Sequence, residues 1–354
     1  MGIQQLMRVP AGQRDLEWLK ESLQSAIELE HSTIPPYLCA WWSVKHVKES
    51  HNKPNPTNTI KNWIGSIVFQ EMLHMGIACN LLAAIGGVPN IYCAGFVPQY
   101  PTPLPGGVRP GLVVGLAGLA KDDATDDIKK KEVVQTFMQI EYPETPLARN
   151  ESSGRGYSTI GEFYDAIVGA FEYLQPAISI DTQLATTLLD PPLKVIATVL
   201  DATDAITLIK DQGEGTGKTP LQTGNSGEVL DPEDLAHYYK FASIYHERLI
   251  APDSSAKSGW SFSGDPLCFP PEDNLYLMAE VPRGGYCESA VVDTMYTKLL
   301  KLLHYAWSDG DAIKLTSAIG SMTALSGAAM SLLDSELPVG PSKGIIGPSF
   351  VFRP

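Results

Sequence analysis

The stretch FQEMLHMGIACNLLAAIGG, residues 69–87, decides the fold, because apolar residues repeat through it at helical spacing. The repeat predicts a helix from about Ile60 to Ile85, stopped by Gly86-Gly87. Its apolar face consists of Ile64, Val68, Met75, Ala78 and Leu82. Glu71 falls at the centre of this face and His74 at its edge. A carboxylate buried there costs free energy unless it is paired or binds a metal, so the helix predicts a buried polar site.

Glu71 and His74 form a Glu-x-x-His pair, which puts both side chains on one face of a helix, a single turn apart. Two-metal carboxylate proteins built on four-helix bundles supply a carboxylate and an imidazole with this spacing. The alternative is that the two residues only hydrogen-bond to each other or to a neighbouring helix. One such pair is a weak signal by itself, so a second buried carboxylate decides between the two interpretations.

A long helix over residues 13–48 carries that second carboxylate. Its apolar stripe consists of Leu16, Leu19, Leu23, Ile27, Ile34, Leu38 and Trp41. At 100° per residue, Glu30 lies within the arc of this stripe, whereas Glu28 lies on the opposite, solvated side. Pro35-Pro36 predicts a kink just after Glu30, because prolines cannot donate to the carbonyls of His31 and Ser32.

The rest of the chain is also mostly helical, with little alternating strand pattern. Helical segments are expected near 113–140, 158–174, 193–210, 232–249, 288–307 and 310–333. Loops rich in Pro, Gly or Ser separate them at 88–112, 211–229 and 251–285. We therefore predict a four-helix bundle with long insertions over residues 1–250, and a loop with a helical hairpin packed on it over 251–354.

The bundle needs further ligands from its other helices. His237 shares a face with Phe241 and Ile244 and is expected to point inward. Asp234 precedes it by three residues but falls in the first turn of the helix, where acidic residues serve as caps. Glu162 is the carboxylate candidate of the third helix. It lies off the apolar stripe of that helix and forms a capping box with Thr159, so the pattern leaves its role open.

Several segments together resemble the ferritin-like domain of iminophenylpyruvate dimer synthases, enzymes of violacein- and rebeccamycin-type pathways. The segments are ELEHSTIPPYL (28–38), FQEMLHMGIACNLLAAIGGVP (69–89), STIGEFYDAI (158–167), DQGEGT (211–216), LAHYYKF (235–241) and IIGPSF (345–350). The resemblance implies metal ligation by Glu30, Glu71, His74, Glu162 and His237. It favours Glu214 over Asp234 as the remaining carboxylate. Glu141, in IEYPE, also matches, but no role follows for it.

The resemblance implies an oxidase or oxygenase of secondary metabolism that acts on an amino-acid-derived small molecule, with oxidative coupling of an imine as the family reaction. Carboxylates with two imidazoles suit iron, with manganese as the alternative, and O2 would be the co-substrate. Tyr37, Trp41, Trp42, Tyr164 and Tyr238 could line a substrate pocket or simply form core. The rival interpretations are a metal-storing bundle and a metal-free helical scaffold.

Composition narrows the partners and the compartment. The net charge of −14, with no basic run, argues against nucleic acid. The five cysteines show no CxxC pair, and the N-terminus lacks a secretory signal, so a cytoplasmic location is expected. No apolar run long enough to span a membrane is present.

Two further motifs carry no function. GEGTGKT (213–219) lacks the first glycine of a phosphate loop, and His304 is interpreted as a core histidine. The sequence leaves a homo-oligomer open.

Overall fold

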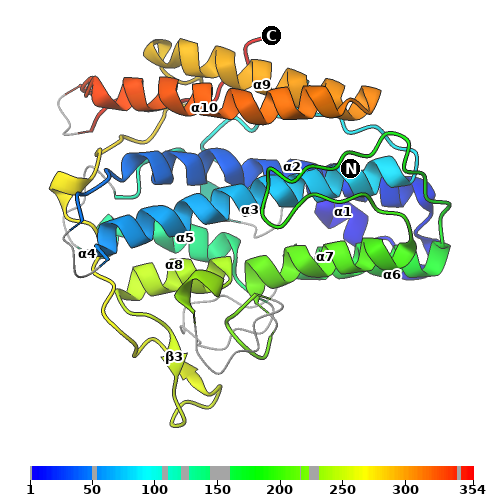
Figure 1. Ribbon diagram of the computed structural model, residues 1–354, viewed down its shortest axis with the longest axis horizontal. Helices are drawn as coiled ribbons and strands as arrows, with labels where there is room; N and C mark the ends of the chain where they lie inside the picture. Colours follow the sequence, from blue (N-terminus) through cyan, green and yellow to red (C-terminus); the bar gives the residue numbers. More distant parts are fainter. Residues whose placement is uncertain are drawn as a thin grey trace.

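Two long helices, α2 (Leu16–Ser43) and α3 (Pro56–Ala84), pack side by side at the centre of the molecule (Figure 1). The computed structural model describes residues 2–49, 54–105, 111–120, 127–143, 160–215, 217–222, 231–340 and 344–354. Asp15 caps α2 by accepting from the Trp18 amide, and Asn55 caps α3 through the Thr57 amide. Both helices are buried along most of their length. A charged residue on either helix therefore needs a partner, which marks it as a candidate site residue.

Helix α2 runs without interruption through Pro35 and Pro36. The carbonyl of Ser32, which Pro36 cannot bond, accepts a hydrogen bond of 2.7 Å from the Tyr100 hydroxyl instead. Ser32 and Thr33 also bond backward, to the carbonyls of Leu29 and Glu30. The carbonyl that Pro36 leaves free at Ser32 therefore has another donor, and α2 continues as one helix past both prolines.

Each of the other two helices of the bundle is interrupted. The third consists of α5 (Glu132–Ile140) and α6 (Ile160–Leu174), and the fourth of α7 (Val199–Glu214) and α8 (His237–His246). Helix α6 packs on α2 and α7, whereas α8 packs on α3 and α5. A short 3₁₀ turn, Pro232–Asp234, precedes α8. The third helix was expected to include part of 113–126, but the described residues there contain strand β2 (Val113–Val114) rather than helix.

The remaining elements are small. Helix α1 (Ile3–Met7) packs on α2 and α6, and α4 (Asp127–Lys130) leads into α5. Strand β1 (Thr102–Pro103) pairs antiparallel with β2, and β3 (Ala251–Pro252) pairs antiparallel with β4 (Trp260–Ser261). The mostly helical prediction is thus confirmed.

A hairpin of α9 (Ala290–Asp309) and α10 (Ala312–Asp334) forms a further layer over α2 and α3 (Figure 1). Its turn uses Gly310, whose φ of +65° is costly for other residues. Trp307 of α9 donates to Asn80 of α3 at 2.9 Å. The hydrophobic core runs continuously from the bundle into this hairpin, so the predicted extension is packed on the bundle.

One helix among the described residues, α3, is long and apolar enough to cross a membrane, but 83% of its most apolar window is buried inside the protein. Core helices of soluble proteins have this character. The composition of α3 is therefore explained by its central position.

Candidate metal centre

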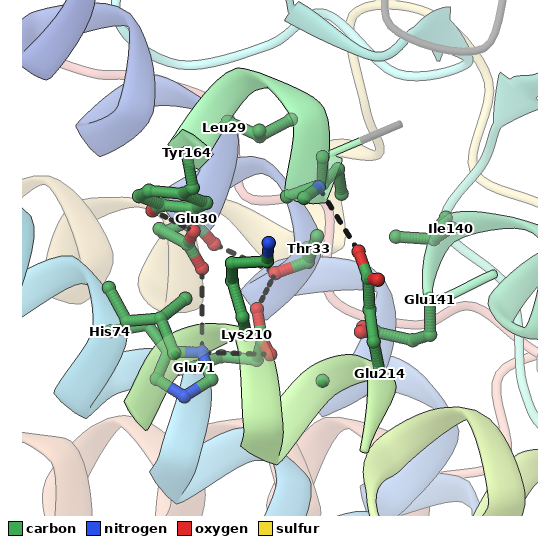
Figure 2. Close-up of a pocket in the computed structure, with 14 residues that line it drawn as sticks. Leu29, Glu30, Thr33, Glu71, His74, Ile140, Glu141, Tyr164, Lys210 and Glu214 are labelled. Atoms are coloured by element: carbon green, nitrogen blue, oxygen red, sulfur yellow. Dashed lines mark hydrogen bonds and ion pairs between the residues drawn. The ribbon is translucent and has the colours of Figure 1, made fainter. Parts of the chain in front are cut away.

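Two buried groups of side chains, which share Glu71, could each hold a metal ion. One group consists of Glu30, Glu71 and His74, and the other of Glu71, Glu141 and His237. Within each group the ligand atoms lie within 4.8 Å of one another. Figure 2 shows Glu30 and Glu71 turned toward His74, with Glu141 on the far side of the cluster. A carboxylate common to two sites is the arrangement expected of a bridged two-metal centre.

His74 presents one ring nitrogen to the carboxylates and the other to an amide. Its Nδ1 lies 3.6 Å from Glu30 Oε2 and 3.5 Å from Glu71 Oε1. Its Nε2 lies 2.8 Å from Gln212 Oε1, which can only accept. The Nε2 atom therefore carries a proton. In the neutral ring this leaves the Nδ1 lone pair facing two carboxylates, and a cation between them would relieve the repulsion.

His237 is oriented in the same way by a longer chain of hydrogen bonds. The carbonyl of Leu235 accepts from Gln222 Nε2 at 3.1 Å, and Gln222 Oε1 accepts from Gln70 Nε2 at 3.0 Å. Gln70 Oε1 must then accept from His237 Nε2, which lies 2.9 Å away. Because a backbone carbonyl only accepts, it sets the direction of every bond in this chain and fixes the protonated nitrogen.

The other nitrogen of His237, Nδ1, is fully buried and makes no aligned hydrogen bond. It lies 3.0 Å from Glu71 Oε1 and 3.6 Å from Glu141 Oε2. A buried nitrogen that faces two carboxylates without an aligned hydrogen bond is explained by a proton or a metal ion held between them. The donor set of carboxylate oxygens and imidazole nitrogens fits iron or manganese.

Hydroxyl groups hold the carboxylates in place. Tyr164 donates to Glu30 Oε1, and Tyr37 donates to Glu141 Oε1 at 2.5 Å. The hydroxyl of Thr33 lies 2.7 Å from Glu71 Oε2. Burial, together with the nearby carboxylates, raises the pKa of both tyrosines well above its usual value, so both remain donors. Such outer partners orient metal ligands and tune their basicity.

Protons supply the positive charge of the cluster in the metal-free protein. Burial lowers the pKa of His74, but Glu30 and Glu71 outweigh burial and raise it to about 10. Burial also lowers the pKa of His237, but its contacts with Glu141 and Glu71 outweigh burial and raise the pKa above its usual value. The pKa of Glu30 is raised, mainly by burial, whereas the two histidines hold that of Glu71 low despite burial. Metal and protons would compete for the same nitrogens.

The cluster lies at the interruptions of the third and fourth helices. Glu141 directly follows α5, Glu214 ends α7, and His237 begins α8. The carboxyl ends of α5 and α7 thus point toward the cluster, and their dipoles favour a cation there. A cavity of about 30 Å³ adjoins the cluster. The residues that border it include Glu141, Glu214, Gly161 and Tyr164. It has room for something the size of a water molecule or a little more.

The structure brings together Glu30, Glu71, His74 and His237, as expected. Glu214 borders the same cavity, where its Oε1 accepts from the Gly161 amide at 3.0 Å (Figure 2).

The structure places two other glutamates differently from the ligand set that the resemblance implied. Glu162 has an exposed side chain and lies outside both groups, because the apolar stripe of α6 turns Phe163 and Ile167 inward instead. Glu141, to which no role was assigned, takes a place in the cluster. Only its presence in the matched segment IEYPE singled it out, because a residue at a helix end belongs to no helical repeat. Asp234 belongs to the 3₁₀ turn and to neither group.

The aromatic residues divide between two regions. Tyr37 and Tyr164 bond the carboxylates of the cluster. Tyr238 is buried against Tyr239, with ring centroids 5.0 Å apart, and belongs to the core. Trp41 and Trp42 instead border a second cavity. His304 is only partly buried, with Nδ1 3.2 Å from the carbonyl of Pro89.

Comparison with known proteins supports the fold. The chain is similar in structure to a ferritin-like protein from Caulobacter vibrioides, with a TM-score of 0.59 and 22% sequence identity over 89% of this chain and 94% of the other. At that identity the likeness shows the fold alone. No curated protein matches the sequence. A family model described as "Ferritin-like" matches residues 23–246, which include most of α2, all of α3 and both interrupted helices. The chain therefore belongs to the ferritin-like family.

Proposed function

We propose that the chain is a metal-dependent oxidase or oxygenase with a two-iron centre. One observation carries the proposal: both buried imidazoles have Nε2 tied to a glutamine oxygen and Nδ1 directed at carboxylates. The two groups that share Glu71 support two ions rather than one. The ligands we propose are Glu30, Glu71, His74, Glu141, His237 and, as the outermost, Glu214.

Four carboxylates and two imidazoles are the ligand set of di-iron and di-manganese bundles. The charges also balance, because four carboxylates neutralise two divalent cations. A bound iron pair would supply the redox equivalents for reaction with O2. The protein would keep bulk water out and hold the carboxylates through Tyr37, Tyr164 and Thr33.

The substrate we propose is an amino-acid-derived small molecule of secondary metabolism. The reaction we propose is oxidative coupling of an imine, as in the iminophenylpyruvate dimer synthases. The proposal rests on the likeness of the sequence to iminophenylpyruvate dimer synthases. The cavity of about 30 Å³ is too small for such a molecule, so the substrate would meet the centre at its rim. Lys210 borders this rim, where it pairs with Asp165 at 2.6 Å. It could provide the counter-charge for a substrate carboxylate.

The experiment that tests this function combines metal analysis with oxygen uptake. Purified protein is loaded with Fe(II) under anaerobic conditions, and iron per chain is measured beside a Glu71→Ala variant and a Glu17→Ala control on the exposed side of α2. We expect about two irons in the parent and the control and fewer than one in Glu71→Ala. O2 consumption should follow the iron content and increase with an aromatic imine substrate. A loaded parent that consumes no O2 would refute the oxidase.

Metal storage is the second candidate, and the small size of the cavity favours it, since a storage centre needs room only for ions and O2. The two functions differ in assembly and capacity. Storage predicts a large cage by gel filtration and many more than two irons per chain. An enzyme predicts a small particle whose iron content saturates near two.

A further inference from the structure

A second and much larger cavity lies between the bundle and the hairpin. Its volume is about 350 Å³, within the range of roughly 300–1,000 Å³ that small-molecule sites occupy. Helices α2 and α3 form one wall, and α9 and α10 form the other. Protein interiors are otherwise packed with few gaps larger than a water molecule, so a cavity of this size is typical of a ligand site.

The cavity and the metal centre are bordered by different residues of α2 and α3. Glu30 belongs to the metal cluster, whereas the next residue, His31, borders the cavity. His74 and Met75 divide in the same way on α3. Successive residues of a helix point about 100° apart, and no described residue borders both this cavity and the one beside the metal cluster. The cavity is therefore distinct from the metal centre and its rim.

The wall of the cavity is apolar and uncharged. None of the described residues that border it is Asp, Glu, Lys or Arg. Trp41, Trp42 and Trp307 supply aromatic surface, and Met75 and Met322 supply flexible side chains that adapt to an occupant. A charged ligand buried here would lack a counter-charge, which excludes ions by their desolvation cost.

A glycine sets the position of one wall. An added Cβ at Gly65 would lie 2.8 Å from two atoms of the Trp41 indole. Glycine therefore lets this ring approach α3 closely, and the ring meets Phe69 at a centroid distance of 5.8 Å. Phe69 borders the cavity and is 48% exposed, so the cavity reaches the surface beside it.

Two buried nitrogens in the wall have no hydrogen-bond partner. They are His31 Nδ1 and Trp42 Nε1, both on residues that border the cavity. The other nitrogen of His31 lies 2.5 Å from the Tyr296 hydroxyl. The indole nitrogen of Trp42 can only donate, whereas the role of His31 Nδ1 depends on which ring nitrogen carries the proton.

We propose that this cavity binds a neutral, largely apolar small molecule that carries an acceptor oxygen, such as an aromatic ketone. The volume sets the size of the ligand, the uncharged wall sets its charge, and the unpaired donor of Trp42 favours an acceptor. Leaving a buried donor unpaired is costly, and a carbonyl oxygen would satisfy Trp42 Nε1 if the indole turns toward the occupant. The site does not depend on the proposed oxidase, because its wall contains none of the proposed metal ligands.

The probe that tests the proposal is Prodan, a neutral naphthyl ketone whose emission responds to polarity and to hydrogen bonding at its carbonyl. Titration of the full chain should give saturable, one-to-one binding with a blue-shifted emission. The anionic dye 1-anilinonaphthalene-8-sulfonate should bind at least about tenfold more weakly, because the wall offers its charge no partner. Equal binding of the two dyes would contradict a site selective for neutral molecules.

A variant that fills the cavity provides the structural test. Ser326 borders the cavity on α10, whereas Ser317 on the same helix is exposed and does not. Ser326→Phe should weaken Prodan binding by about tenfold or more, and Ser317→Phe should change it less than about twofold. If Ser326→Phe does not fold, Leu303→Trp tests the opposite wall on α9, with the neighbouring Leu302→Trp as control. Unchanged binding in a folded cavity variant would overturn the proposal, whatever the iron content.

Discussion

Glu71 is the residue on which both halves of the metal centre depend. Its Oε1 atom lies 3.5 Å from His74 Nδ1 and 3.0 Å from His237 Nδ1, and Thr33 holds its other oxygen. Its position at the middle of the apolar face of α3 made it identifiable in the sequence. His74 follows one turn later on the same helix, but His237 and Thr33 come from α8 and α2, and no pattern within α3 specifies those two partners.

Whether Glu141 rather than Glu162 is a metal ligand can be tested directly. Glu141→Ala should lower bound iron from about two to about one per chain, because Glu141 belongs to only one of the two groups. Glu162→Ala should retain the full content, since its side chain is exposed. Elemental analysis of both variants after loading decides the matter. Loss of iron in Glu162→Ala alone would restore the assignment that the resemblance implied.

Metal affinity should increase with pH. The raised pKa of His74, about 10, means that its ring is protonated at neutral pH in the metal-free protein. A metal ion must displace that proton, so the apparent affinity should rise by up to about tenfold per pH unit and per displaced proton between pH 6 and pH 8. Competition with a Mn(II) chelator of known pH dependence measures this. Affinity that is flat with pH would mean that the histidines are neutral before metal binds.

At the scale of elements, the interruptions of the third and fourth helices make the site. A continuous helix would occupy the core with its own side chains, whereas the ends of α5, α7 and α8 bring Glu141, Glu214 and His237 to one place. The Gln70–Gln222 pair ties α3 to the segment between α7 and α8. This connection orients His237 from a distance.

Removal of that connection should weaken metal binding without unfolding the bundle. Gln70→Leu deletes the acceptor of His237 Nε2, and outer-partner changes of this kind typically cost about 10- to 100-fold in metal affinity. Gln5→Leu, at an exposed position of α1, is the matched control. Metal titration monitored with circular dichroism separates lost affinity from lost structure. Parent-like affinity in a folded Gln70→Leu variant would remove the glutamine from the mechanism.

At the scale of the whole molecule, the C-terminal tail fastens the hairpin layer. The buried carboxylate of Asp293 on α9 accepts from the Val351 amide at 3.1 Å and from Arg353 Nε at 2.9 Å. The tail also reaches α2, where Cys39 Sγ lies 3.9 Å from the carbonyl of Pro348. These contacts keep the wall formed by α9 over the second cavity.

Asp293→Ala should therefore destabilise the protein. The substitution leaves the Val351 amide without its acceptor, and such losses cost about 1–3 kcal/mol. Asp309→Ala removes an exposed ion pair with Lys314 and should leave the stability close to that of the parent, because water screens such pairs. Urea denaturation of the two variants gives the comparison. Equal stability of both would mean that the tail contributes little to the fold.

The sequence by itself determined the helical class and the inward direction of Glu30, Glu71 and His74, because a continuous helix repeats every 3.6 residues and so reveals which face is buried. It could not place Glu141, whose position after the end of α5 belongs to no repeat. Nor could it bring His31 to Tyr296, 265 residues away. Only the tertiary structure decided how the interrupted helices meet and what lies beneath the hairpin, because contacts between distant segments depend on packing rather than on local periodicity.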